Sequence, residues 1–430
     1  MCLLLTSQNT RDTSIVPELA ALRETCEIQL TEDSIYWDSG YVREQTVDQL
    51  LDWNVDDKPI CAVVGPVAYE AHAGLAAISE HWHIPQVAYA TLDHKLSRDD
   101  WFPNFVRLTP TGTSFGETMP AALARDIWDR RFVANIYEED YGEQFENPIE
   151  DAEDDEAIGY ETLTESYTPG DDESVEEALK YVTDGEDGYR TVLLTMDQWS
   201  MIDDIARWAY DLKVVGDGYF WVSMAVGIGV WIIASCPTVV LTSIFLGLIL
   251  KAITGDALPV AQLEKLELEK GDPLDVLLDG AAVFTNYDRF MYRPENDKFL
   301  QVWRQQGLAE VQNVLSKQPR AASNESGIVA SLPDDYFQLV DPVHYASYIY
   351  DAVMASGISA CAAAHFAEGQ ETSENVHVDM LKRTTFTGAS GPVEFMKNDD
   401  DEPGPDRDPA GVIYGLHNVR PVEQPNGKRK

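Results

Sequence analysis

A turn near residue 65 carries the side chains whose types and placement best suit ligand binding. A short apolar strand, Cys61–Val64, runs into Gly65-Pro66, and a helix with apolar residues at helical spacing follows. Tyr69 and Glu70 stand in the turn between the two elements. Such a turn leaves helix N-terminal N–H groups unpaired, and open α/β sheets bind small molecules in crevices of this kind.

Catalytic and metal-binding patterns do not accompany this turn. The sequence holds no hydrolytic triad pattern, Walker loop or dinucleotide fingerprint. Half of the eight histidines lie close together, but no cysteine or carboxylate ligand pattern goes with them. These are His72, His81, His83 and His94. We therefore expect structural histidines, no catalytic residue, no metal and no cofactor.

Length and charge restrict the class of protein. A chain of 430 residues exceeds what one core usually supports, so two lobes are expected. Its 74 acidic against 31 basic residues give a net charge of −43. Nucleic acid is therefore not an expected partner, and anionic membrane surfaces are disfavoured. A solubilising acidic surface suited to a salty exterior explains the charge, and an acidic interaction surface is the alternative.

Strands and helices are predicted to alternate along most of the chain. The strand patterns cover 61–64, 86–90, 105–110, 132–137, 160–167, 190–196 and 219–222. The helical patterns cover 113–129, 174–182 and 343–366, and Ile202, Ile205, Ala206 and Ala209 mark a further helix face. The acidic segment 146–156 is expected to be a solvated loop or helix surface. This alternation indicates parallel sheets with right-handed crossovers.

The uncharged segment Tyr219–Leu250 is long enough to cross a bilayer. Pro237 near its centre and the lack of flanking Lys/Arg clusters weigh against a span. We prefer an anomalous insert at about 225–255, with a buried hairpin and a true membrane span as the alternatives.

Several motifs occur in an order that resembles the receptor family ligand-binding region. They are Gly65-Pro66 before a helix, Ile84-Pro85-Gln86, FVRLTPT over 105–111, EEDYGEQF over 138–145, Tyr350–Val353 and the closing segment Thr385–Phe395. The resemblance runs, with gaps, from about Cys26 to Asn418. This family comprises the bilobed ectodomains of metabotropic glutamate, GABA-B and natriuretic-peptide receptors.

The resemblance implies an α/β fold of two Rossmann-like lobes with parallel sheets, joined by a three-strand hinge as in type I periplasmic binding proteins. We expect the first part of lobe 1 over 1–125 and lobe 2 over 126–285. The second part of lobe 1 should follow over 286–390, and closing strands and a tail over 391–430.

The resemblance also implies where a ligand is held. In amino-acid-binding relatives, two hydroxyl residues hold the ligand's α-carboxylate and a tyrosine of lobe two closes over it. Thr91 lies at the position of the second hydroxyl or one place from it, and Tyr141 matches the tyrosine. Glu70 stands where the first hydroxyl is expected. A carboxylate within about 4 Å of Glu70 is repelled by several kcal/mol, so an amine-bearing or neutral ligand, or a peptide, fits better.

Two structural alternatives apply to these residues. Glu70 can instead complement the helix dipole, and Tyr141 can be an ordinary core or surface tyrosine. Ser223, at the carboxyl end of a lobe-two strand, is a further candidate contact. Tyr69, next to Glu70, is the last of the candidate ligand contacts.

The expected function is that of an extracellular receptor-type domain that captures a small molecule or peptide between its lobes and signals by hinge closure, without chemistry. The alternatives are a single-pass membrane protein anchored by 219–250, a soluble α/β enzyme, and a solute-binding protein for amino-acid transport. A homodimer through lobe 1 is expected. The chain shows no signal peptide, so we infer an upstream piece. Cys26–Cys61 is the disulfide that the resemblance implies, with free thiols as the alternative.

Overall fold

The structure is a computed structural model. It describes residues 62–65, 69–126, 129–139, 142–154, 156–184, 189–196, 201–216, 218–224, 268–285, 294–305, 335–339, 342, 346–367, 376–397, 401–412, 414–419, 422–424 and 428–429. These residues form two compact units. Unit 1 takes the described residues up to Pro110 and those between Asp288 and Ile413, and the other described residues form unit 2.

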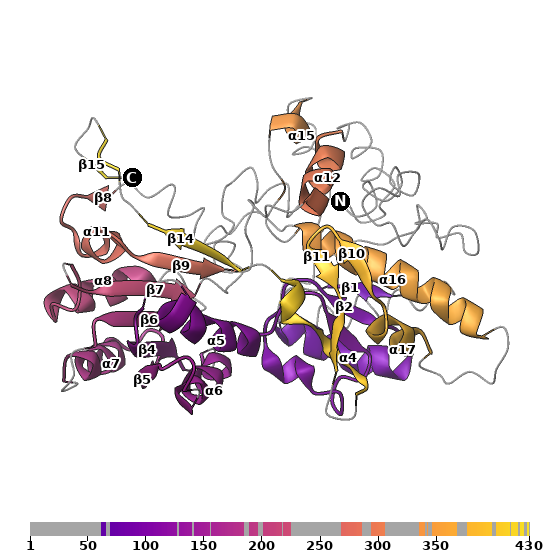
Figure 1. The fold of residues 1–430 in the computed structure, drawn as a ribbon, viewed down its shortest axis with the longest axis horizontal. Coiled ribbons are helices and arrows are strands. Elements are labelled where there is room, and N and C mark those ends of the chain that lie inside the picture. The colour runs from indigo at the N-terminus through magenta and orange to yellow at the C-terminus, as the bar shows by residue number, and fades with distance from the viewer. Residues whose placement is uncertain are drawn as a thin grey trace. The chain divides into compact units, whose positions relative to one another are not determined.

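Unit 1 is built on a five-stranded sheet in the order β1-β2-β3-β13-β12 (Figure 1). The strands are β1 (Val63–Val64), β2 (Gln86–Ala88), β3 (Phe105–Arg107), β12 (Phe395–Lys397) and β13 (Pro403–Arg407). All neighbours run parallel except β12, which is antiparallel to β13. The β-α-β unit predicted from the sequence is present, because α4 (Tyr69–His81) connects the parallel strands β1 and β2.

Apolar side chains of α4 bind this helix to the sheet. Leu75 packs with Val63 and Ile84 in one cluster, and Ala76 packs with a second group around Phe105. Among the described residues, unit 1 also holds the α-helices α12 (Pro294–Arg304), α15 (Tyr336–Leu339), α16 (Ala346–Ala367) and α17 (Val376–Lys382). The hairpin formed by β10 (Phe386–Gly388) and β11 (Gly391–Val393) completes the unit.

Unit 2 is built on a six-stranded sheet in the order β14-β9-β7-β6-β4-β5 (Figure 1). The strands are β4 (Phe132–Glu138), β5 (Glu161–Tyr167), β6 (Thr191–Thr195), β7 (Phe220–Met224), β9 (Ala282–Thr285) and β14 (Gly415–Asn418). Five of them are parallel, and β14 pairs antiparallel with β9. The short strands β8 (Leu268–Glu269) and β15 (Lys428–Arg429) form a separate pair.

One face of the unit 2 sheet packs on α7 (Asp172–Asp184), α8 (Ile202–Asp211) and α11 (Pro273–Leu278) through a shared apolar core. The helix face predicted for α8 is confirmed, since Ile202, Ile205, Ala206 and Ala209 are all buried in this core. Strand β6 is buried along its whole length, which explains its continuous apolar pattern.

A second helical layer of unit 2 holds α5 (Gly112–Ala121) and α6 (Glu143–Asp151). They pack closely at Gly116, where an added Cβ would stand 2.9 Å from the Cβ of Pro148. The helix predicted over 113–129 changes to π-helical geometry over Ala122–Asp126, a change that the periodicity did not indicate. The acidic segment is helical, and its few apolar residues, Ile149 and Ala152, are buried.

The chain passes from unit 1 to unit 2 after Pro110, earlier than the residue 125 expected from the sequence. The reason is the packing of α5 against α6, which assigns α5 to unit 2. The closing segment is likewise divided, because the part up to Ile413 belongs to unit 1 while Tyr414 and the following β14 belong to unit 2.

In the part of the chain that the structure describes, no helix has the length and apolar character needed to cross a bilayer. Residues 220–224 of the uncharged segment form β7, between β6 and β9 in the sheet. Residues 225–250, and with them most of the proposed insert, lie outside the described residues.

Candidate ligand-binding site

The carboxyl ends of β2 and β3 place Thr91 in a tightly bonded segment of unit 1. Thr91 is 5% exposed and follows β2 after two buried residues. The hydroxyl of Thr109, which follows β3, donates to the Thr91 carbonyl oxygen at 3.1 Å. The N–H of Leu108 donates to the Ala88 carbonyl at 2.9 Å. The chain after β3 therefore holds the chain after β2 at the edge where open α/β sheets bind ligands.

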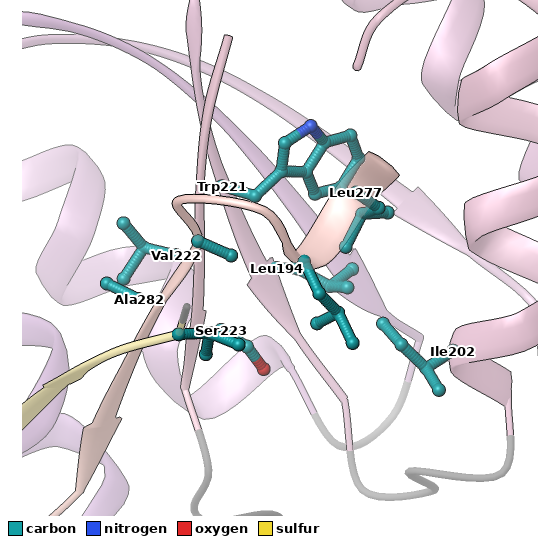
Figure 2. Close-up of a pocket in the computed structure, with 10 residues that line it drawn as sticks. Leu194, Ile202, Trp221, Val222, Ser223, Leu277 and Ala282 are labelled. Atoms are coloured by element: carbon teal, nitrogen blue, oxygen red, sulfur yellow. The ribbon is translucent and has the colours of Figure 1, made fainter. Parts of the chain in front are cut away.

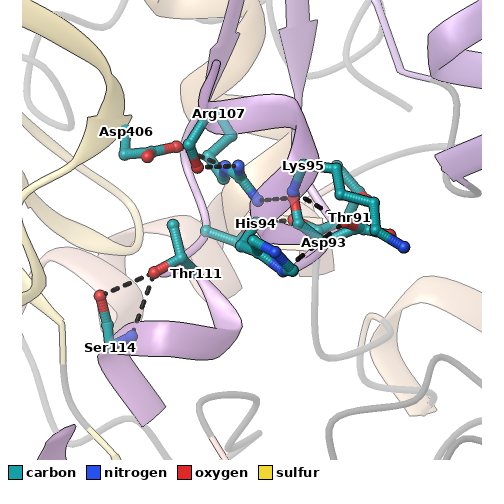
Figure 3. Close-up of polar contacts among 10 residues, drawn as sticks. Thr91, Asp93, His94, Lys95, Arg107, Thr111, Ser114 and Asp406 are labelled. Carbon is teal, nitrogen blue, oxygen red and sulfur yellow. Dashed lines mark hydrogen bonds and ion pairs between the residues drawn. The ribbon is translucent and has the colours of Figure 1, made fainter. Parts of the chain in front are cut away.

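Arg107 fixes the next part of the same segment (Figure 3). Its guanidinium donates from Nη1 to the Asp93 carbonyl at 2.9 Å and from Nη2 to the Ser97 hydroxyl at 2.7 Å. Its Nε pairs with Oδ1 of Asp406 on β13 at 2.5 Å. Asp93 in turn caps the short 3-10 helix His94–Ser97 by accepting from the Lys95 N–H at 2.8 Å.

Because Arg107 is buried, its hydrogen-bond donors and its charge all need partners within the protein. The side chain is 0% exposed, and a buried guanidinium is tolerated only where its donors are satisfied and its charge is paired. Asp406 supplies the charge, and two residues of the Asp93–Ser97 segment accept further donors. Because these donors are rigid and planar, they set where the segment after Thr91 lies.

A second buried arginine, Arg407, connects β13 to the hairpin β10–β11 and to β3. It donates to the carbonyl oxygens of Pro392 at 2.5 Å and Leu108 at 3.0 Å, and to the Ser390 hydroxyl at 2.7 Å. The Ser390 hydroxyl and N–H both donate to Asp351 on α16. The Ala389 N–H donates to the same carboxylate at 2.6 Å.

The Asp351 carboxylate is fully buried in this network. Burial raises its pKa to about 6, against the opposing effects of Arg407 and of the Ser390 and Ala389 donors. The carboxylate lies so close to the hairpin that an added Cβ at Gly388 would overlap it. Asp351, Ser390 and Arg407 thus fasten α16, the hairpin and the end of β3 into one body.

Unit 2 begins with a capped helix. Thr111 is the N-cap of α5, and its hydroxyl accepts from the Ser114 N–H at 3.1 Å and bonds the Ser114 hydroxyl at 3.0 Å (Figure 3). A capping hydroxyl of this kind satisfies one of the free N–H groups of the first helical turn.

Comparison with known proteins assigns the family. The family model described as "Receptor family ligand binding region" matches residues 36–404. The chain belongs to this family.

Two further similarities agree with the assignment. Over 85 residues the chain is 29% identical to the rat (Rattus norvegicus) protein "Taste receptor type 1 member 2", a match that covers 20% of this chain and 10% of that protein. The chain thus spans only about a tenth of that receptor. Its fold resembles the crystal structure of the leucine binding protein LivK from Thermotoga maritima, with a TM-score of 0.50 and 14% identity over 90% of this chain and 83% of that one.

The structure describes some of the ligand contacts predicted from the family resemblance and not others. Thr91 is described and lies in the segment held by Thr109 and Arg107. Tyr69 and Glu70 form the first turn of α4, and their side chains lie outside what the structure describes. Tyr141 also lies outside the described residues. The proposal that these residues meet at one ligand stays a prediction.

Ser223 of unit 2 lines a small internal pocket (Figure 2). The pocket measures about 10 Å³, room for one water molecule at most. Its other walls are apolar and include Leu194, Trp221 and Leu277. Ser223 is 8% exposed, and its hydroxyl has no hydrogen-bond partner in the described part of the chain. A ligand contact by Ser223 therefore requires this pocket to open.

The clustered histidines occupy different environments. His72 is fully buried, bonds Gln86 through Nδ1 at 2.7 Å and packs edge-on to Phe105 at 5.4 Å, which is a structural role. His81 and His83 are exposed near the end of α4. Among the residues that the structure describes, no three His, Cys, Asp or Glu side chains are grouped to hold a metal ion.

The only cysteine among the described residues, Cys361 on α16, is buried and disulfide-bonded. The predicted pair Cys26–Cys61 lies outside the described residues.

Residues that build the site in unit 1 were missed by the sequence analysis. Arg107 lies in the FVRLTPT motif and Asp351 in the Tyr350–Val353 motif, but neither received a role. The available signal was a charged residue inside an otherwise apolar strand or helix, since charges are buried only when they are paired.

Proposed function

We propose that this chain is the ligand-binding region of a receptor-type protein, which captures a small molecule or short peptide between its two lobes and transmits binding by hinge closure. The family match supports the binding function. The single observation that carries the proposal for this chain is the rigid segment at Thr91. Arg107 and Thr109 hold it at the strand ends where such folds take their ligands.

Thr91 and Tyr141, with Tyr69 and Glu70 in the turn before α4, are the proposed ligand contacts, and Ser223 is a further candidate. Glu70 makes the binding turn of unit 1 negatively charged. The proposed ligand is therefore an amine-bearing or neutral molecule rather than one held by its α-carboxylate. The leucine binding protein named above leads us to include amino acids among the compounds to test.

An extracellular location is the second part of this proposal. The disulfide at Cys361 supports it, because disulfides persist in oxidising compartments. The glycosylation sequon Asn324-Glu325-Ser326 is consistent with secretion. A transport-type solute-binding protein is the second candidate, favoured by the fold shared with the leucine binding protein.

A thermal-shift and calorimetry panel tests the proposal. We expect an amine or neutral compound to raise the melting temperature, and Glu70→Gln to weaken an amine at least about tenfold, the loss expected for a charge-assisted contact. Asp379→Asn is the matched control, since Asp379 is exposed on α17 of the same unit. Equal effects of the two substitutions, or a panel without any binder, would contradict the proposed site.

A dimer through lobe 1 is part of the same proposal. Leu75 is buried in the unit 1 core, so a partner would meet exposed positions of α4 such as Glu80 and His81. Sedimentation velocity over a range of protein concentrations checks the oligomeric state. We expect a monomer–dimer equilibrium, which Glu80→Lys weakens.

A further inference from the structure

Four buried polar atoms lie without a hydrogen-bond partner among the described residues of β4, β5 and β6. They are both amide atoms of Asn135 and the hydroxyls of Thr164 and Thr195. Asn135 and Thr195 are 0% exposed. A buried amide or hydroxyl that lacks a partner is costly, so native proteins nearly always give it one.

Strand register brings these atoms to one face of the unit 2 sheet. Asn135 is the direct partner of Thr164 on β5, and Tyr137, two residues further along β4, is the direct partner of Thr195 on β6. Paired residues of neighbouring strands point to the same side, as do residues two apart in one strand. Asn135, Thr164 and Thr195 therefore share a face. Asn135 and Thr164 stand side by side on adjacent strands about 4.8 Å apart, whereas Thr195 lies on the other side of β4 and two residues further along.

Helices close this face from solvent. Ala134 and Ile136, which alternate with Asn135, pack into the core shared with α7, α8 and α11. The opposite face, which carries Asn135 and Tyr137, is directed to α6. On that face, burial and the hydrogen bond that the Tyr137 hydroxyl donates to Glu146 raise the pKa of Tyr137. Since α6 packs on β4 and β5, the Asn135 amide and the Thr164 hydroxyl lie between the sheet and α6.

Not every threonine on this face lacks a hydrogen-bond partner. The hydroxyl of Thr162, two residues before Thr164, donates to the Val133 carbonyl at 3.2 Å. Thr164 makes no such bond, although its side chain stands beside the Asn135 amide.

We infer that an ordered water molecule is bound here, bridging the Asn135 amide and the Thr164 hydroxyl beneath α6. A buried water needs two to four polar partners, and the two amide atoms with the Thr164 hydroxyl supply them. Neither side chain is charged, so the site suits a neutral molecule that both donates and accepts. Such a water would join β4 and β5 on the face opposite the apolar core.

A crystal structure of the full chain at about 1.8 Å resolution tests the inference directly. We expect a density peak about 3 Å from the Asn135 amide and from the Thr164 hydroxyl. The inference is overturned if the site is empty, or if Asn135 rotates to bond Thr164 directly.

Asn135→Leu gives a second test, because a bound water and a dry site predict changes of opposite sign in the melting temperature. If water is bound, the apolar side chain removes its main partner and strands the Thr164 hydroxyl, so the melting temperature falls by about 2–6 °C. If the site is dry, the substitution removes an unsatisfied amide, so the melting temperature rises. An unchanged or higher melting temperature overturns the inference.

Thr162→Val is the matched control for both experiments. It removes a hydroxyl from the same face of β5, but one whose partner is a backbone carbonyl. We expect the water density to stay in this variant, and its loss there would count against a site formed by Asn135 and Thr164.

Discussion

At the scale of single residues, buried arginines make the hydrogen bonds and ion pairs that hold the candidate site together. Arg107 has one charged partner and two acceptors in the segment after Thr91. Removing one member of a buried ion pair leaves the other charge uncompensated, which typically costs 3–5 kcal/mol. Arg107 is therefore expected to affect both stability and the position of the ligand segment.

Arg107→Met should lower the free energy of unfolding by about 3 kcal/mol and speed amide exchange over residues 91–97. Arg107→Lys should restore part of the stability but not the slow exchange, because an ammonium cannot reproduce the planar donors. Denaturant titration and hydrogen exchange measure the two effects. Arg98→Met, which removes an exposed pair with Asp100, is the control. Equal amide exchange rates over residues 91–97 in Arg107→Met and the parent protein would show that Arg107 does not position this segment.

The sequence could not assign Arg107 its role because its partner is remote. Asp406 lies 299 residues further along the chain, and Asp351 meets Ala389 after 38 residues. Sequence periodicity indicates which side chains meet only when they lie within one helical turn or one pair of neighbouring strands. The orphaned polar atoms of Asn135 are equally hidden, since they depend on the register of three strands.

At the scale of elements, Asp351 couples α16 to the hairpin β10–β11. Its pKa of about 6 lies above the ordinary value of 3.8, so the folded state holds a proton that the unfolded chain releases. A raised folded-state pKa adds stability that is fully present below about 3.8 and is lost as pH rises through about 6.

Asp351→Asn should be less stable than the parent, because its amide cannot accept every bond from Ala389 and Ser390. The gap in melting temperature should be widest near pH 4.5 and should narrow as pH rises through about 6, because only the parent then buries a charge. Thermal melts between pH 4.5 and 7.5 measure this gap. Asp379→Asn, at an exposed position of α17, controls for loss of a surface charge. A difference in melting temperature that widens toward pH 7.5 would contradict a raised pKa of Asp351.

Element types followed well from periodicity, whereas helix geometry and ends did not. The apolar faces of α8 and β6 predicted both elements, because each buries a regular pattern in one core. The π-helical turn over Ala122–Asp126 was not predicted, since it follows Pro120 inside α5 and depends on how that segment packs.

At the scale of the whole molecule, the charge of −43 opposes folding through self-repulsion. Salt screens this repulsion, because the Debye length falls from about 30 Å at 0.01 M to about 8 Å at 0.15 M. We therefore expect the melting temperature to rise with NaCl over this range. Potassium chloride should act in the same way, and a salt-independent melting temperature would show that the charge is already neutralised locally.

The two-unit division and the family agree with a binding protein, and the central claim is that a ligand contacts the strand ends of unit 1. Hydrogen exchange of the full chain with and without the strongest binder from the panel tests it most directly. We predict slower exchange over residues 65–72 and 89–97, with slower exchange at 138–143 as the second lobe closes. Protection confined to other segments, or none at saturating compound, would contradict the account.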